Sequence, residues 1–294
     1  MLKKIIILML APVVILLAAY LYGVYQNNRS VPYPQKVQIQ QQLEKSIQWL
    51  VNNENKILSK TNPMLWWMLY EVHEISQDKR VGDLLEKYHQ RNQRIKKGVW
   101  GPLFDGGKRR NLGAYSVQGL PYYNQHLIYA LNCAADIEDE LPIVAQQNGA
   151  EFCHQLQYFY RPACTTHQLM GINFLFTRQC TVLSNIDEVS QALQKDIVGQ
   201  LTWDIRVVDV YLQRVLMLLI TGAEASVEPI WIQQVLDHQL VDGGWGDFVA
   251  LLGSDTGRSL GFSSKVLSLG REKSNFHATA QGVYILSYLV ANKS

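Results

Sequence analysis

The feature that most constrains the fold is a spacing of about 40 residues between polar positions that each begin an apolar helical run. His126, His167 and Asp209 are 41 and 42 residues apart, and apolar residues follow each of them at helical intervals. A lone helical hairpin cannot bury its apolar face, so a repeat of paired helices must stack on its neighbours. The spacing predicts either a superhelical array or a closed toroid of helical hairpins.

The apolar periodicity predicts ten helices in five antiparallel pairs, and no segment alternates for long enough to indicate a sheet. We expect these helices at residues 36–58, 62–77, 79–96, 122–137, 140–160, 164–183, 187–200, 204–221, 228–240 and 276–291. With 294 residues and 48% hydrophobic content, the chain can bury a substantial core. The expected organisation is an N-terminal segment at 1–26, a linker at 27–35 and one helical domain at 36–294.

The C-terminal part carries a more specific pattern. Residues 232–248 join an apolar helical run to a glycine-rich turn closed by Trp245, whose indole buries a large apolar face. Residues 275–286 then open a second helix with a polar start and an apolar remainder. This pairing resembles the QW-type repeat of the terpenoid cyclase and protein prenyltransferase superfamily. The resemblance, which covers about 60 residues, implies that the helices close into an α/α toroid.

The N-terminal segment has the pattern of a membrane signal. Lys3 and Lys4 precede the uncharged run 5–22, which approaches the ~20 residues that cross a bilayer. Ala18-Ala19 makes a poor cleavage site, which favours an uncleaved anchor. Lys3 and Lys4 favour an N-terminus on the cytoplasmic side of the membrane. The expected fold class is therefore all-α, an α/α toroid of about five helical hairpins preceded by one N-terminal transmembrane helix. We expect a single-pass membrane protein that is bound to the bilayer through residues 5–22. Its main domain is expected outside the cytoplasm, which is the periplasm if the cell is Gram-negative.

Four cysteines allow three complete pairings. Cys164 and Cys180 are expected on one helix, about 24 Å apart and beyond disulfide reach. Cys133 and Cys153 fall at similar depths on consecutive predicted helices, so a bridge between them is an open alternative. Four buried thiols are the favoured interpretation.

Two connections are too long for ordinary helix hairpins. Residues 98–120 and 241–274 each contain a Trp-Gly step and are expected on one rim, above the starts of the inner helices. Free N–H groups and the positive helix ends also point to that rim. We interpret the polar residues that begin these helices, together with two carboxylates of the second loop, as acid-base candidates: His126, His167, Asp209, His277, Asp242 and Asp247. The alternative is that each caps a helix or bonds within its own turn.

The first long loop gathers positive charge in a chain whose formal charge is only +2. This balance lacks the basic footprint of a nucleic-acid-binding protein, so no nucleic acid is expected as a partner. A local basic cluster predicts capture of an anionic small molecule, a lipid or a glycan, and the alternative is a solvated loop. The candidate ligand-binding residues of the two loops are Trp100, Asp105, Lys108, Arg109, Arg110 and Trp245.

The resemblance also implies tests of activity. Class II terpenoid cyclases use an acidic DxDD cluster, and the sequence contains none. Protein prenyltransferases hold zinc with Asp, Cys and His; His277 falls at the position of the ligand histidine, but no Asp-x-Cys pair precedes it. We therefore predict no metal ion and no cofactor.

The sequence thus leaves two functions open. The first is a membrane-anchored extracytoplasmic toroid with a polar cavity at one rim, acting as an enzyme on an isoprenoid, lipid-like or glycan substrate. The second is a non-catalytic toroid that binds a glycan, a peptide or a partner protein at the same rim.

Overall fold

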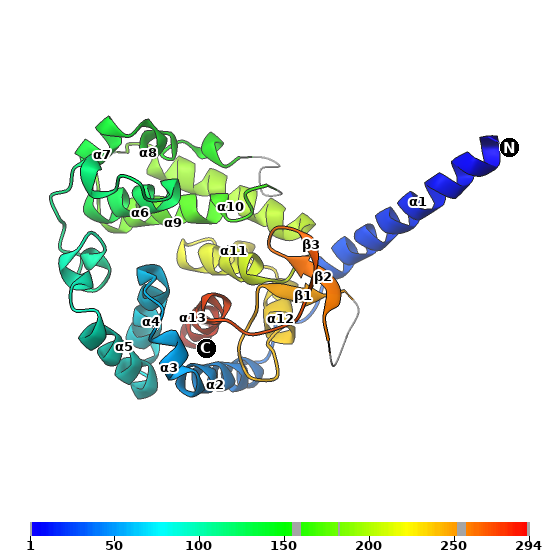
Figure 1. Cartoon of the computed structure of the whole chain (residues 1–294), viewed down its shortest axis with the longest axis horizontal. Helices are drawn as coiled ribbons and strands as arrows, with labels where there is room; N and C mark the ends of the chain where they lie inside the picture. The colour runs from blue at the N-terminus through cyan, green and yellow to red at the C-terminus, as the bar shows by residue number, and fades with distance from the viewer. Residues whose placement is uncertain (1, 155–159, 182, 252–256, 293–294) are drawn as a thin grey trace.

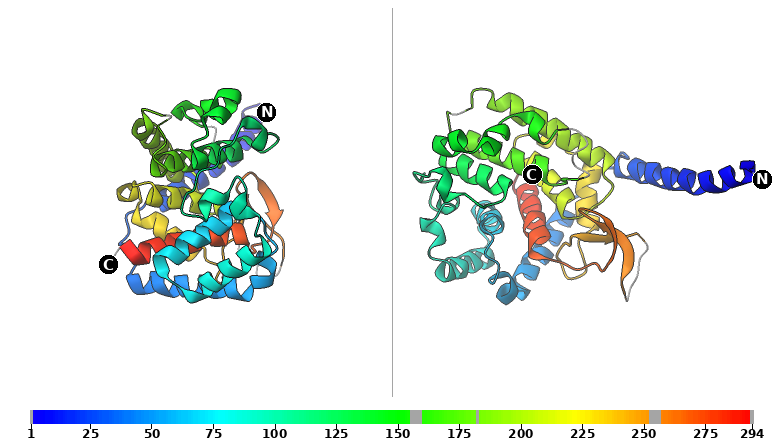
Figure 2. Two further views of the ribbon diagram at one scale, coloured as in Figure 1. Left: turned by 90° about the vertical axis from the view of Figure 1, so that its left-hand side faces the viewer. Right: turned by 45° about the horizontal axis from the view of Figure 1, so that its top comes forward.

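A computed structural model of the chain describes residues 2–154, 160–181, 183–251 and 257–292. The helices pack into one body, and one long helix projects from it (Figures 1 and 2). The α-helices are α1 (Leu2–Asn27), α2 (Lys36–Asn52), α3 (Glu54–Ile57), α4 (Pro63–Ser76), α5 (Lys79–Arg91), α6 (Tyr122–Asn132), α7 (Ala135–Glu140), α8 (Pro142–Gln146), α9 (Cys164–Thr177), α10 (Ile186–Trp203), α11 (Asp209–Ile220), α12 (Pro229–Asp237) and α13 (Phe276–Asn292). Short 3-10 helices lie at Ile95–Lys97, Gly101–Leu103, Ala114–Ser116, Ala150–Phe152 and Glu224–Ser226, and the strands are β1 (Phe248–Ala250), β2 (Ser259–Ser263) and β3 (Leu267–Gly270).

The hydrophobic core lies between two layers of helices. Helix α13 packs against α4, α11 and α2, while α9 packs against α6 and α10. Every residue of α13 from Ala278 to Ser287 is buried, as expected for a helix that is apolar on all sides. This layering is compatible with an α/α toroid, and it brings the starts of α4, α9, α11 and α13 to the walls of shared pockets.

The hairpin of α4 and α5 shows how local sequence sets helix ends. Pro63 occupies the first turn of α4, and the Asn62 side chain caps it by accepting a hydrogen bond from the Met64 amide at 3.0 Å. The helix ends at Gln77, whose φ of 53° is left-handed, and the Asp78 side chain then caps α5. These residues fix where α4 begins and ends and where α5 begins.

The predicted all-α class is wrong, because the segment 241–274 contains a three-stranded antiparallel sheet in the order β1-β2-β3. Val249 pairs with Phe262, and the Phe248 ring lies so close to Gly261 that a Cβ there would be 2.4 Å from it. Strands of three to five residues are too short to produce a clear alternating pattern in the sequence. The fold is mostly helical with a small sheet.

The helix predicted at 140–160 is also wrong. The described part of that segment holds α8 and a 3-10 turn at Ala150–Phe152. Pro142 cannot continue the hydrogen-bonded ladder of α7, so a new helix starts there. Residues 155–159 of the predicted helix lie outside the described residues.

The predicted transmembrane helix must be corrected as well. Among the residues that the structure describes, no helix combines the length and the apolar character needed to cross a membrane. The end of α1 is instead docked on the body: Asn27 is 2% exposed, and its side chain donates to the Leu201 carbonyl at 2.6 Å and accepts from the Tyr211 hydroxyl at 3.0 Å. Trp231 donates to the Asn27 carbonyl at 3.2 Å. These bonds tie the end of α1 to α10, α11 and α12.

All four cysteines are paired, so the favoured interpretation of four thiols and the alternative bridge from Cys133 to Cys153 are both wrong. Cys133 pairs with Cys180 and Cys153 with Cys164, at Cα separations of 5.4 and 5.5 Å. Cys133 ends α6 with a left-handed φ of 49°, and Cys180 follows the left-handed residue after α9. The first bridge therefore joins the ends of two packed helices, and the prediction that Cys164 and Cys180 do not pair is confirmed.

Candidate functional site

An acid-base pair lies where two inner helices begin. Asp209 is the first residue of α11 and His277 the second of α13, and these helices pack against each other. Oδ2 of Asp209 lies 3.2 Å from Nδ1 of His277. The aspartate side chain is 19% exposed and the histidine 42%, so the carboxylate is enclosed while the imidazole reaches solvent.

Hydrogen bonds hold the Asp209 carboxylate in its ionised form. Its Oδ1 atom accepts from the Val210 amide at 2.8 Å and from the Ser264 hydroxyl. Burial alone would raise the pKa of Asp209, but the hydrogen bonds from His277 and Ser264 outweigh it and hold this pKa below its ordinary value. Because an ionised carboxylate can only accept, Nδ1 of His277 donates, and in the neutral tautomer that this bond selects Nε2 is the nitrogen with a lone pair. A histidine oriented in this way is typical of a general base.

A second histidine lies near the pair. Nδ1 of His167 is 2.7 Å from the Ala163 carbonyl, and its ring centroid lies 4.8 Å from that of Tyr123. A carbonyl only accepts, so Nδ1 carries the proton and Nε2 is an acceptor. Burial lowers the pKa of His167 despite that bond, while the charges of His277 and Asp209 act on it in opposite directions. His167 is therefore a neutral acceptor in the electrostatic field of the pair.

Two adjoining pockets meet at His277. We name them after their residues: the histidine pocket, of about 500 Å³, is lined by His167 and His277, and the lysine pocket, of about 610 Å³, is lined by Lys56, Lys60 and Lys273. Both are within the size range of small-molecule sites. Asn62, Leu65 and His277 line both pockets, so the imidazole lies at their junction.

The two pockets differ in chemistry. The histidine pocket has a mixed wall. Its apolar members come from α4, α6, α9 and the first long loop and are Met64, Met68, Met170, Leu127, Leu120 and Trp100, and its polar members include Asn62, Asn124, His167, Gln213 and His277. The lysine pocket contains three lysines against the two carboxylates of Asp209 and Asp247. The histidine pocket thus offers flexible methionine side chains and the lysine pocket offers positive charge, and the pair of Asp209 and His277 lies between them.

His126 does not join this site. It is fully buried, its Nε2 lies 3.1 Å from the Asn148 side-chain oxygen, and it lines neither pocket. Burial lowers the pKa of His126 to about 4. Its ring also packs against Gly171, where a Cβ would be only 2.2 Å away. His126 is a neutral histidine inside the interface of α6 and α9.

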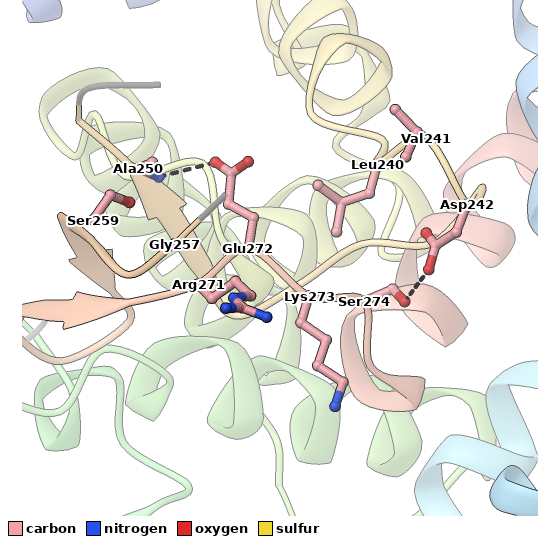
Figure 3. Close-up of a pocket in the computed structure, with 10 residues that line it drawn as sticks. All are labelled: Leu240, Val241, Asp242, Ala250, Gly257, Ser259, Arg271, Glu272, Lys273 and Ser274. Carbon is pink, nitrogen blue, oxygen red and sulfur yellow. Dashed lines mark hydrogen bonds between the residues drawn. The ribbon is translucent and has the colours of Figure 1, made fainter. Parts of the chain in front are cut away.

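The candidates of the second long loop are divided between pockets. Asp247 lines the lysine pocket, whereas Asp242 lines a third pocket of about 440 Å³. Figure 3 shows Asp242 beside Ser274, whose hydroxyl donates to it at 2.5 Å; the Trp49 indole also donates to it at 3.1 Å. Trp245 is 1% exposed and donates to a backbone carbonyl of α12 at 2.8 Å. Trp245 therefore closes the turn onto its helix and lines none of these three pockets.

The basic residues of the first long loop have internal partners. Arg110 forms an ion pair with Asp105 and donates to the Lys96 and Lys108 carbonyls, at 2.8 and 2.6 Å. Arg109 donates to the Arg178 carbonyl. These contacts fix the loop in place and bind it to the end of α9. Of the loop candidates, Trp100 alone lines the histidine or the lysine pocket.

Within the described residues, no group of three or more His, Cys, Asp or Glu side chains is placed to hold a metal ion.

Sequence reasoning missed several lining residues. Asn62-Pro63 is a readable helix start, but nothing in it indicates a cavity. Lys56 and Lys60 precede that start, and Lys273 comes from the far end of the chain, so only the packing of α13 against α4 brings them together. No sequence signal identifies Ser264 as a partner of Asp209.

Comparison of the chain with protein families, with curated proteins and with solved structures finds no match. The likeness to the QW-type repeat remains a prediction, and a function can be inferred only from the residues of the site.

Proposed function

We propose that this protein is an acid-base enzyme that activates water with His277 and Asp209 and cleaves a bond in an amphipathic substrate. The observation that carries the proposal is the position of this pair at the junction of a pocket lined in part by methionines and a pocket lined by three lysines. The resemblance to a superfamily whose members bind lipid-like molecules in such a cavity is consistent with it.

The geometry suggests the role of each group. Nε2 of His277 takes a proton from a water molecule and returns it to the leaving group. Asp209 accepts from Nδ1, keeps the ring in the required tautomer and stabilises the imidazolium that forms. His167, held neutral by burial, offers Nε2 as an acceptor that orients the water or the substrate. No serine, threonine or cysteine of the described chain hydrogen-bonds to His277, which favours water as the nucleophile.

The pockets suggest the substrate. An apolar part would pack against the methionines and leucines of the histidine pocket, where adaptable thioether side chains fit varied shapes. A negatively charged or strongly polar part would lie near Lys56, Lys60 and Lys273. Together these features support a lipid-like substrate with a charged group.

The two disulfides support a location for this activity. Structural disulfides persist in oxidising environments such as the periplasm or the extracellular space and are rare in the cytosol. All four cysteines of this chain are bridged. We propose that the domain works outside the cytoplasm.

The test is hydrolysis of p-nitrophenyl esters of graded chain length, with p-nitrophenyl glycosides in parallel. His277→Ala should abolish turnover, and Asp209→Asn should lower kcat by about 100-fold or more, in keeping with the contribution of general acid-base groups. The matched control is His154→Ala, since His154 and Asp196 form a similar pair at 2.6 Å on the exposed surface. Equal losses in the His154 and His277 variants would refute the assignment.

The missing side-chain nucleophile makes non-catalytic binding the second candidate. In that case a lipid-like ligand would be recovered unchanged by mass spectrometry after incubation with the wild-type protein. His277→Ala would then reduce affinity without any product having formed in either protein.

A further inference from the structure

A separate cavity lies where the β2–β3 hairpin meets the end of α1 and the segment after α10. Its volume is about 280 Å³, and its wall is mainly apolar, formed by Tyr20, Trp203, Ile205, Phe262, Val266 and Leu267. We call it the hairpin pocket. It shares none of these residues with the histidine and lysine pockets, so it is a second site and does not depend on the proposed function.

The back wall of the hairpin pocket is built from fixed groups. The Tyr20 hydroxyl donates to the Trp203 carbonyl at 2.9 Å, and Ile205 lies so close to Gly23 that a Cβ there would be 2.9 Å away. On the other side, Arg206 donates to the Ser264 carbonyl at 2.9 Å and so holds the turn of the hairpin. The cavity is therefore preformed on two sides, which lowers the entropic cost of binding.

Three charged residues line the hairpin pocket. Asp204 and Arg206 line it and are paired at 2.6 Å, and Arg214 makes a second ion pair with the same carboxylate at 2.7 Å. Lys265, which is exposed, also lines the pocket. Lys265 belongs to neither of these ion pairs, so its ammonium group would favour a negative charge on a ligand.

The mouth of the pocket is apolar. Trp203, Val266 and Leu267 are 50%, 59% and 53% exposed, which is unusual for large apolar side chains grouped around one cavity. A cavity volume just below ~300 Å³ is at the lower end for ligand sites, so the occupant must be small.

From this combination we propose that the hairpin pocket binds a medium-chain aliphatic carboxylate. The chain packs between Phe262, Ile205 and Leu267, and the carboxylate lies toward Lys265. A neutral chain would lack the ionic contact, and a short anion would lack the apolar one.

Methyl NMR of the full-length chain, labelled at isoleucine δ1 methyl groups, tests this with octanoate, acetate and octanol as probes. Octanoate should shift the Ile205 methyl signal, assigned with Ile205→Val, in a saturable way, while acetate and octanol should bind at least about tenfold more weakly. Ile15, which is 67% exposed on α1, reports non-specific contact and should not saturate with octanoate. Absence of an Ile205 shift, or equal affinity for octanol, would overturn the proposal.

Matched substitutions place the ligand. Leu267 and Leu269 are both exposed on β3, but only Leu267 lines the pocket. Leu267→Asp should weaken the affinity for octanoate by about tenfold or more, because it places a carboxylate against the aliphatic chain of the ligand. Leu269→Asp should leave this affinity unchanged. Lys265→Gln should weaken the affinity for octanoate about threefold, as expected for loss of an exposed ion pair. Arg258→Gln, which changes a residue outside the pocket, should leave this affinity unchanged. Equal effects within either pair would show that the carboxylate does not occupy this pocket.

Discussion

Asp209 and His277 face each other across the first turns of two packed helices, with Oδ2 of one 3.2 Å from Nδ1 of the other. The contact is completed by Ser264, which belongs to the β2–β3 turn and binds the second carboxylate oxygen. Three distant segments of the chain therefore meet at one carboxylate. Because the imidazole remains partly exposed, its free nitrogen can be probed chemically.

Diethylpyrocarbonate acylates the unprotonated nitrogen of an accessible histidine. We expect His277 to react, since its side chain is 42% exposed and Asp209 contacts Nδ1 rather than Nε2, and we expect fully buried His126 to be protected. Asp209→Asn should slow the reaction of His277 because the fixed tautomer is lost, while exposed His154 should react at its wild-type rate. Peptide mass spectrometry measures all three rates, and unchanged modification of His277 in the Asn variant would contradict the pairing.

The buried ion cluster at Asp204 predicts acid sensitivity. Burial alone would raise the pKa of Asp204, but Arg206 and Arg214 outweigh it and hold this pKa below its ordinary value. A depressed folded pKa stabilises the protein above the unfolded value of about 3.9, and the contribution is lost as pH falls through the lower folded value. Asp204→Asn should cost about 3–5 kcal/mol at pH 7, because two buried arginine charges lose their ion pair with this carboxylate.

Urea unfolding between pH 2 and pH 7 measures this effect, with exposed Asp83→Asn as the control. The free energy of unfolding of the Asp204 variant should depend less on pH in the acid range than that of the wild type. If the free energy of unfolding depends on pH in the same way in the wild type and the Asp204 variant, protonation of Asp204 does not control the acid stability of the fold.

The tight packing around Trp245 predicts that substitutions there destabilise the fold strongly. It is 1% exposed and bonded to the Val235 carbonyl, and a Cβ at Gly282 would lie 2.5 Å from its ring. Trp245→Ala should therefore destabilise by about 3 kcal/mol through loss of buried area, and Gly282→Ala by about 1–3 kcal/mol through overpacking. Thermal unfolding followed by circular dichroism tests both; a melting temperature unchanged in either variant would mean that the indole does not fill this site.

The two disulfides should contribute unequally. The bridge from Cys133 to Cys180 spans 47 residues and that from Cys153 to Cys164 spans 11. In the chain-entropy account the larger loop stabilises by about 4 kcal/mol and the smaller by about 3 kcal/mol. Paired Cys→Ser variants, compared by urea unfolding without reductant, should follow that order, and the reverse order would indicate that native contacts rather than loop closure dominate.

The lysine pocket predicts a salt-dependent preference for anionic substrates. Changing Lys56, Lys60 and Lys273 to Gln should lower kcat/KM for an ester that carries a carboxylate by about tenfold at low salt, from three exposed charges of ~0.5 kcal/mol each. The loss should shrink at physiological ionic strength, where screening acts over ~8 Å. A matched triple change of Lys96, Lys97 and Lys108 should have little effect, and a neutral ester should not distinguish the variants.

Local sequence was sufficient to predict most of the helices. The range predicted at 276–291 is confirmed by α13 at Phe276–Asn292, and that at 187–200 by α10 at Ile186–Trp203. Apolar periodicity and helix caps act within a few residues, so they can be read from the chain. The same reading failed at 248–270, where strands of three to five residues are stabilised by pairing with one another.

The candidate site needed the tertiary structure. Sequence spacing placed His126, His167, Asp209 and His277 in one register. His126 is nevertheless separated from the cavity, because it is buried between α6 and α9. Lys56 and Lys273 line the cavity although they come from opposite ends of the domain. The bridge from Cys133 to Cys180 likewise required two helix ends to meet. The sequence by itself determined which segments coil into helices and which polar residues begin them, because those preferences are local. Only the packing of the helices decided which residues share a pocket, because that depends on contacts between segments far apart in the chain.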